Sequence, residues 1–112
     1  MKVKTTVLFL MLAMPLPGMS KWSDKSDLET VEVALCTAAI MKAGMGIEPY
    51  RKWAAALNKR YSQIYEAKSA TEIDKYTSER IVDKRAELQR KGVITTAAFR
   101  SFYETNCKNH HP

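Results

Sequence analysis

Residues 49–65, PYRKWAAALNKRYSQIY, decide the fold of this chain. Their apolar members recur three or four positions apart, at Tyr50, Trp53, Ala54, Leu57, Tyr61, Ile64 and Tyr65. Because an α-helix completes a turn in about 3.6 residues, this spacing lines the side chains up along one face. Pro49 is tolerated in a first helical turn, where its missing N–H has no partner to lose. We therefore expect a helix that begins at Pro49 and buries this stripe in a core.

A second helix is expected on the N-terminal side of this one. Ser26 and Glu29 have the spacing of a capping box, in which each side chain accepts a hydrogen bond from the other residue's backbone N–H. Apolar residues then recur at helical spacing up to Gly44, a residue type that commonly ends helices. The pattern predicts a helix that starts at Ser26 and a glycine turn over residues 44–46.

A third helix is expected after a connector at residues 68–71, and Gly92 ends it. Its acidic and basic residues alternate, which is typical of a helix that is largely solvated. Its sparse apolar positions can still line one side, at Ile73, Thr77, Ile81 and Leu88.

The last helix is expected to begin after Thr95, with Ile94 and Phe99 placed as a hydrophobic staple around this N-cap. It carries Cys107, and residues 108–112 form a polar tail that we expect to fray. The sequence has no sustained alternation of apolar and polar residues and no Asn-Gly or Asp-Gly turn, so no strand competes with these helices.

The fold class that follows is all-α, a small bundle of about four helices. Short connections favour an up-and-down arrangement in which the first and last helices lie antiparallel as neighbours. Such an arrangement places the Gly44 and Gly92 turns at the same end of the bundle. It also places Cys107 beside the middle of the first helix.

The first twenty residues have the three parts of a secretory signal peptide. Lys2 and Lys4 precede an uncharged apolar run over residues 7–14, which is shorter than the roughly 20 residues of a membrane-spanning helix. Cleavage after Ser20 would leave an N-terminal extension at 21–25, a helical domain at 26–107 and the tail at 108–112. It would also lower the formal charge from +6 to +4, which weakens any case for nucleic-acid binding.

Two cysteines, Cys36 and Cys107, remain in the mature chain. An even number of cysteines in a small exported domain predicts a disulfide, here between the first and last helices of the mature chain. An intermolecular bridge is the alternative. There is no C-x-x-C pair, so the sequence gives no indication of redox catalysis by sulfur.

The residues that would support an enzyme or a cofactor are sparse. Glu79, Asp83 and Glu87 share one helix face, but a solvated face gives none of the desolvation that a carboxylate acid catalyst needs. His110 and His111 lie in the tail, which lacks the preorganised ligands of a metal site. Heme ligation by Met41 or Met45 with a terminal histidine is disfavoured by the expected topology. We expect no enzyme, no metal and no cofactor.

Two kinds of surface residue are candidates for binding a partner: tyrosines, and the basic residues on the outer side of the helix expected over residues 49–65. Tyrosine suits half-exposed interfaces because its ring is apolar and its hydroxyl is polar. Clustered Lys and Arg side chains attract an anionic partner. The candidate partner-binding residues are Tyr50, Arg51, Lys52, Lys59, Arg60 and Tyr65.

These observations favour an exported, periplasmic and non-enzymatic protein that acts through protein–protein contacts. An accessory factor of a secretion or conjugation system and an inhibitor or immunity protein fit equally well. The alternative is a small membrane-active or toxic protein whose basic face meets anionic lipid in the cell envelope.

Overall fold

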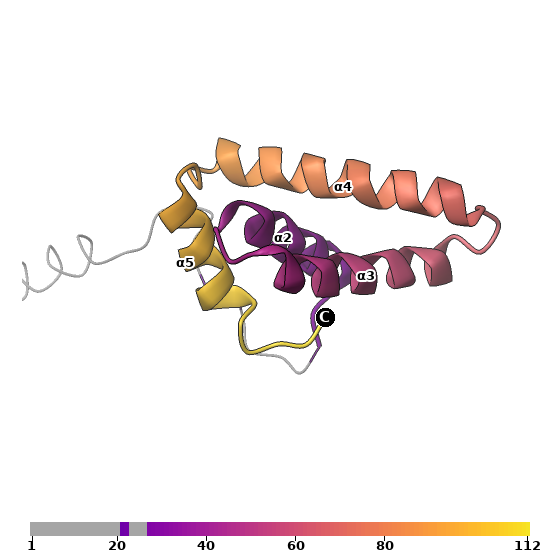
Figure 1. The fold of residues 1–112 in the computed structure, drawn as a ribbon, viewed down its shortest axis with the longest axis horizontal. Coiled ribbons are helices and arrows are strands. Elements are labelled where there is room, and N and C mark those ends of the chain that lie inside the picture. The colour runs from indigo at the N-terminus through magenta and orange to yellow at the C-terminus, as the bar shows by residue number, and fades with distance from the viewer. Residues whose placement is uncertain (1–20, 23–26) are drawn as a thin grey trace, which may run out of the picture.

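Four helices make up the described part of the chain in this computed structural model, which covers residues 21–22 and 27–112 (Figure 1). They are α2 (Thr30–Lys42), α3 (Ile47–Ile64), α4 (Ala70–Arg90) and α5 (Thr96–Asn106). These residues contain no strand, so the predicted all-α fold with about four helices is confirmed. None of these described helices has both the length and the apolar composition of a membrane span. The predicted signal peptide at residues 1–20 lies outside the described residues.

α2 is the central helix, and it packs against each of the other three. Five of its apolar side chains have no exposed surface, those of Val33, Ala34, Cys36, Ala38 and Ala39. A helix that is apolar around most of its circumference gains by burial on several sides at once, and its small side chains allow close approach of the neighbouring helices. Figure 1 shows α3 and α4 running alongside it.

The start of α2 differs from the prediction. The helix begins at Thr30 with Glu29 as its N-cap residue, and Ser26 lies outside the described residues. The capping box is formed by Glu29 and Glu32 instead. The Glu29 N–H donates to Glu32 Oε1 over 2.8 Å, and the Glu29 side chain accepts from the Glu32 N–H. Two carboxylates suit this end of a helix because the helix dipole is positive there. The predicted start at Ser26 is therefore wrong.

The start of α3 also differs from the prediction. The helix begins at Ile47 rather than at Pro49, and Gly46 precedes it with a φ of +90° that favours glycine. Pro49 is the third helical residue, where a backbone N–H still has no partner within the helix. The predicted reason for tolerating the proline therefore holds, although Pro49 is the third residue of the helix and not the first.

The predicted stripe of α3 enters the core only along part of its length. Trp53, Leu57 and Tyr61 are buried, as expected. Ile64 and Tyr65, the last two members of the stripe, are 54% and 37% exposed. The expected burial is therefore wrong for Ile64, whereas Tyr65 was already a candidate surface residue. The C-terminal end of the stripe leaves apolar surface outside the core.

α4 packs on α2 and α3 as the longest helix. Its four predicted inward positions are buried, which confirms the sparse apolar side, at Ile73, Thr77, Ile81 and Leu88. A polar bridge joins α3 to α4, because the Asn58 amide donates to Asp74 Oδ1 over 2.9 Å and to Thr77 Oγ1 over 3.2 Å. This bridge fixes the register of the α3–α4 hairpin.

α5 runs at a steep angle to the other helices rather than antiparallel to α2, and it packs closely on α2 alone among the described helices (Figure 1). Thr95 is its N-cap, as predicted, and its hydroxyl oxygen accepts from the Ala98 N–H over 3.1 Å. Ile94 is 66% exposed while Phe99 is buried, so the predicted staple does not bury Ile94. The antiparallel placement is wrong because α3 and α4 already run along α2, and the short α5 covers the remaining buried surface by crossing it.

The turns at Gly44 and Gly92 lie at the same end of the bundle, as predicted (Figure 1). Arg100 of α5 reaches the end of α2, where its Nε and Nη2 atoms donate to the Ala43 carbonyl over 3.1 and 2.9 Å. Gly44 follows with a φ of +69°. A side chain at position 44 would also stand 3.3 Å from Arg100 Nη2. This turn therefore needs glycine for its backbone and for its close contact with α5.

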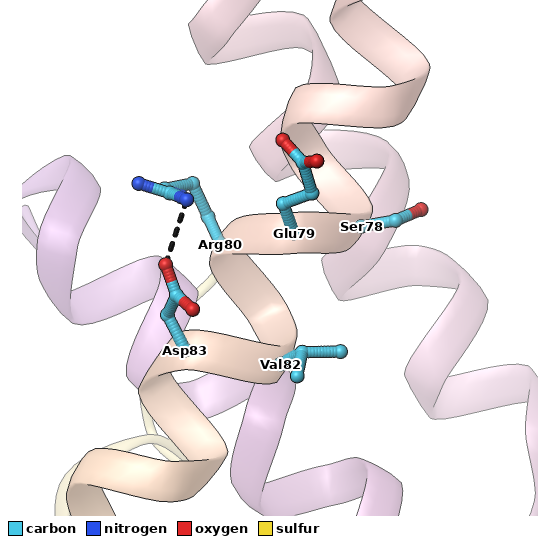
Figure 2. A pocket seen from close by; sticks show the side chains of 5 residues that line it. All are labelled: Ser78, Glu79, Arg80, Val82 and Asp83. Atoms are coloured by element: carbon cyan, nitrogen blue, oxygen red, sulfur yellow. Dashed lines mark ion pairs between the residues drawn. The ribbon is translucent and has the colours of Figure 1, made fainter.

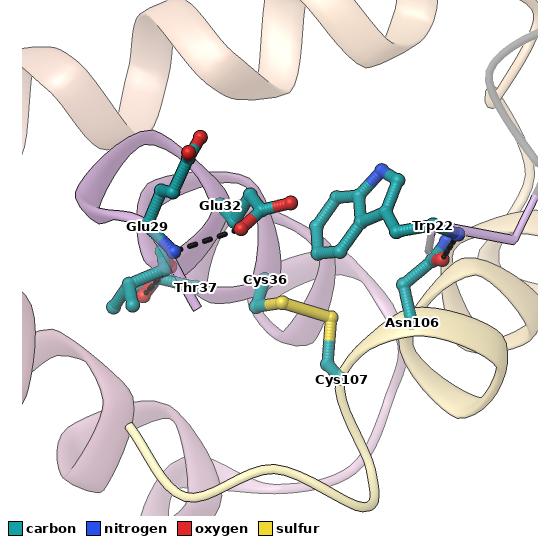
Figure 3. Close-up of a disulfide and its surroundings, with 8 residues drawn as sticks. Trp22, Glu29, Glu32, Cys36, Thr37, Asn106 and Cys107 are labelled. Atoms are coloured by element: carbon teal, nitrogen blue, oxygen red, sulfur yellow. Dashed lines mark hydrogen bonds between the residues drawn. A yellow bond between two sulfur atoms is a disulfide. The ribbon is translucent and has the colours of Figure 1, made fainter. Parts of the chain in front are cut away.

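A disulfide joins Cys36, in the middle of α2, to Cys107 at the end of α5, as predicted (Figure 3). The two Cα atoms are 5.9 Å apart, and neither cysteine has exposed surface. Beside it, the backbone N–H of Trp22 donates to Asn106 Oδ1 over 2.8 Å. The Trp22 ring packs edge-on against Phe102, with the ring centroids 5.5 Å apart. One covalent bond therefore holds the crossing of α2 and α5, and Trp22, which precedes α2 in the chain, packs against α5 beside it.

The tail begins in a hydrogen-bonded turn. The Lys108 N–H donates to the Tyr103 carbonyl over 3.0 Å, and the His110 N–H donates to the Cys107 carbonyl over 2.9 Å. Residues 108–110 therefore continue the chain after α5 as a hydrogen-bonded turn directly after Cys107, and the expected fraying of the tail stays a prediction.

Candidate functional site: a tyrosine cluster at the tip of the α3–α4 hairpin

Three tyrosines gather where α3 ends and α4 begins, and we call Tyr61, Tyr65 and Tyr76 the tyrosine cluster. Tyr61 and Tyr65 are one helical turn apart on α3, and Tyr76 faces them from α4. The ring centroids of Tyr61 and Tyr76 are 4.9 Å apart and nearly perpendicular, and those of Tyr65 and Tyr76 are 5.2 Å apart. Edge-to-face packing of this kind is favourable because the positive ring edge meets the negative ring face. The short connection between the helices brings these rings together.

Two phenols of the tyrosine cluster, those of Tyr61 and Tyr65, have raised pKa values. Burial of Tyr61, aided by the neighbouring Tyr76, raises the pKa of its phenol to about 12. The hydrogen bond between the Tyr65 and Tyr76 hydroxyls, 3.3 Å long, raises the pKa of Tyr65 as well. Phenols with raised pKa values do not act as bases near neutral pH. The tyrosine cluster is therefore suited to contact rather than to proton transfer.

Two cations border the tyrosine cluster. Lys68 Nζ lies 5.9 Å from the Tyr65 ring centroid and 6.0 Å from that of Tyr76, within the range of a cation–π contact. The Arg80 guanidinium lies 5.0 Å from the Tyr76 centroid and forms an ion pair of 2.7 Å with Asp83. Asp83, on the same helix, thus neutralises the charge of Arg80. Lys68 places a positive charge at the edge of the tyrosine cluster.

The predicted partner-binding residues do not form one patch. Tyr50 and Tyr65 lie about 22 Å apart along α3, given a rise of about 1.5 Å per residue. Arg51 is exposed and forms an ion pair of 3.4 Å with Glu48, and Lys52 and Lys59 are exposed. Tyr65 belongs to the tyrosine cluster.

Arg60, another predicted partner-binding residue, has a structural contact. Its Nη1 atom donates to the Leu28 carbonyl over 2.8 Å and to Thr30 Oγ1 over 3.5 Å. Arg60 therefore holds the chain just before α2 and is half-buried. Tyr76, Lys68 and Arg80 of the candidate site were missed, because nothing in a helical repeat says which residue of the following helix faces the end of the stripe.

The three acids of α4 are spread along its outer face. Figure 2 shows the Asp83 carboxylate turned to Arg80, with the Glu79 carboxylate directed away from it. Glu87 forms ion pairs with Lys84 at 3.3 Å and with Lys91 at 3.6 Å. Partial burial raises the pKa of Glu87, but the two lysines outweigh this effect and lower it overall. The hollow beside these acids is lined by Ser78, Glu79, Arg80, Val82 and Asp83 of one helix, so it has no opposing wall.

The described residues hold no group of three or more His, Cys, Asp or Glu side chains that could bind a metal ion. His110 is half-buried beside the start of α3, and His111 is exposed. Comparison of the chain with family models, with curated proteins and with solved structures found no match.

Proposed function

We propose that this chain is an exported, periplasmic, non-enzymatic protein that acts by binding another protein, and that the tyrosine cluster with Ile64 is its binding surface. Its role would be that of an accessory factor of a secretion or conjugation system, or of an inhibitor or immunity protein. The observation that carries the proposal is the exposed apolar end of α3, which continues a buried stripe into solvent.

The composition of this surface supports a protein partner. Ile64 and Tyr65 expose apolar area that the core does not use, and Tyr65 and Tyr76 present rigid rings. Such rings bury a large area at a low cost in side-chain entropy, which is why tyrosine is enriched at binding hot spots. Lys68 adds a charge that can orient a partner at the rim.

The disulfide supports export. A buried bridge between Cys36 and Cys107 fits a chain that folds in an oxidising compartment. The basic and apolar start of the sequence supplies the corresponding signal peptide. Mass spectrometry of the periplasmic fraction tests both points. The expected species begins at Lys21 and is two hydrogens lighter than its reduced form, whereas free thiols or an intact leader would contradict export.

Photocrosslinking in intact cells tests the binding surface. A benzophenone side chain placed at Tyr65 should crosslink to a discrete protein, and the same side chain placed at Ile94 is the control. Ile94 is 66% exposed and apolar but lies at the other end of α4. Equal crosslinking at both positions, or none at Tyr65, would contradict the proposal.

Paired substitutions give a second test. The double variant Ile64→Ser, Tyr65→Ser should weaken retention of the partner roughly tenfold, which corresponds to about 1.4 kcal/mol. The matched control is Val82→Ser, Ile94→Ser, which removes two other exposed apolar side chains and should leave retention unchanged. Circular dichroism confirms that both variants keep their helices. The alternative is a membrane-active protein. Salt-sensitive binding to anionic liposomes that both variants retain would favour this alternative.

A further inference from the structure

A pocket of about 460 Å³ lies between the first two turns of α3 and the C-terminal segment. In Figure 1 this segment leaves α5 and returns toward α3, where the chain end is marked. Residues from three separate parts of the chain line the pocket: Glu48, Pro49, Lys52, Trp53, Tyr103, Lys108 and His110. The pocket therefore exists only where the fold brings the start of α3, Tyr103 of α5 and the C-terminal segment together.

The outer wall of the pocket is anchored. The disulfide at Cys107 immediately precedes Lys108, and the backbone hydrogen bonds of Lys108 and His110 continue the turn. Ligand sites benefit from such fixed walls because less conformational entropy is lost on binding.

The floor of the pocket is aromatic. Trp53 and Tyr103 pack edge-to-face with their ring centroids 6.1 Å apart, and Trp53 is 3% exposed. Because Trp53 is held in the core, the floor is rigid. Tyr103, which is half-buried, presents the apolar ring surface that a flat group above the floor can contact, and Trp53 packs behind it.

The rim of the pocket is positively charged. Within the described residues, Lys52 and Lys108 form no ion pair or hydrogen bond through their ammonium groups. The one acid of the rim, Glu48, is paired with Arg51 at 3.4 Å. Two uncompensated ammonium groups beside an imidazole favour an anionic occupant.

We propose that this pocket binds an organic carboxylate with a flat apolar body, with the body on Tyr103, behind which Trp53 packs, and the carboxylate between Lys52 and Lys108. Two sources share this chemistry, a free aromatic acid and the C-terminal carboxylate of a peptide that ends in an aromatic residue. The pocket lies about 18 Å along α3 from the tyrosine cluster, given about 1.5 Å per residue. Its occupancy is independent of the proposed protein partner.

Titration of the oxidised protein with benzoate, followed by amide and indole NMR signals, tests this site. Benzoate should shift the Trp53 indole and the Lys108 and His110 amides in a saturable manner, with a Kd on the order of 1 mM, as befits a ligand of this size. Benzamide has the same shape without the charge, and acetate has the charge without the ring. Both should bind at least roughly fivefold more weakly, because each lacks one of the two contacts.

Charge-matched variants separate the site from the overall charge of the protein. Lys52→Gln, Lys108→Gln should weaken benzoate binding roughly tenfold. The control Lys59→Gln, Lys75→Gln removes the same charge from exposed positions outside the pocket and should leave it unchanged. An equal loss in both variants, or a benzoate response at the Trp22 indole instead of the Trp53 indole, would overturn the proposal.

A peptide arm identifies the source of the carboxylate. Tighter binding of a short peptide with a free C-terminal phenylalanine, relative to both its amidated form and benzoate, assigns the pocket to peptide ends. Tighter binding of benzoate assigns it to free acids. Equal binding of the acid and amide forms in both series would exclude a carboxylate site.

Discussion

At the scale of single residues, Arg100 connects α5 to the C-terminal end of α2. Its guanidinium donates two hydrogen bonds to the carbonyl of Ala43, a residue with no exposed surface. A buried carbonyl without a partner is costly, so Arg100→Ala should lower the free energy of unfolding by about 1–2 kcal/mol. Urea denaturation followed by circular dichroism measures this loss.

Arg90→Ala is the matched control for this prediction. Arg90 is an exposed arginine of α4 with no hydrogen bond or ion pair to the described residues. Its removal should change stability by less than about 0.5 kcal/mol, as is usual at such surface positions. Equal effects of the two substitutions would show that the bonds to Ala43 contribute nothing to stability.

Tyr61 makes stability depend on alkaline pH. Its pKa is about 12 in the folded protein against about 10 in an unfolded chain, so deprotonation favours unfolding. The stabilising contribution is complete below about pH 10 and is lost as the pH rises toward 12. Tyr65, whose pKa is also raised, acts in the same direction.

The Tyr61→Phe variant tests this pH dependence. The fall in the urea midpoint between about pH 10 and pH 12 should be smaller in the variant than in the unsubstituted protein, because phenylalanine has no proton to lose. Lysines titrate in the same range in both proteins, so the difference between the two curves isolates Tyr61. Parallel curves would contradict the assigned pKa.

At the scale of helices, the start of α4 depends on Ser69. Its hydroxyl oxygen accepts from the Glu72 N–H over 3.2 Å, and the Ser69 N–H donates to Glu72 Oε1 over 2.8 Å. Loss of an N-cap hydroxyl typically costs about 1 kcal/mol, so Ser69→Ala should destabilise the protein by that amount.

Ser78→Ala is the comparison for the Ser69 prediction. Ser78 lies exposed within α4, where alanine is the better helix former, so its replacement should leave stability unchanged or slightly higher. A loss at Ser78 as large as that at Ser69 would rule out capping as the cause. Chemical denaturation of both variants gives the two values.

The sequence predicted helices better than their starts and crossings. The stripe from Trp53 to Tyr61 and the buried side of α4 follow from periodicity, since burial on one face requires it. The start of α2 was misplaced because Ser26 is a stronger N-cap type than Glu29, yet the chain uses Glu29. The crossing of α5 depends on what already surrounds α2, which no local pattern contains.

The candidate sites were predictable only in part. Tyr65 and Lys52 were recognised as surface residues from their types and spacing. Their surroundings were not, because Tyr76 and Lys108 reach them through the tertiary arrangement. Arg60 and Arg100 illustrate the same limit, since an arginine that donates to a backbone carbonyl looks like any solvated arginine in a sequence.

At the scale of the whole molecule, the Cys36–Cys107 bridge closes 71 residues of chain. Restricting the unfolded chain in this way stabilises the folded state by about 4 kcal/mol on the loop-entropy estimate. The double variant Cys36→Ala, Cys107→Ala should lose about that amount in urea denaturation, and its m-value should rise because its unfolded chain exposes more surface. An unchanged m-value with unchanged stability would show that the bridge does not constrain the unfolded chain.

The same bridge limits how far the protein can be stretched. A force applied at both ends can extend the residues outside the bridge, but the 71-residue loop stays closed until the sulfur–sulfur bond breaks. At about 3.5 Å per extended residue, the closed loop reduces the length to which the chain can be extended by roughly 250 Å. An unfoldase or a narrow pore that grips the chain near Pro112 meets this loop at Cys107, within one or two nanometres. Threading would therefore require a reductant, or a channel wide enough for two strands side by side.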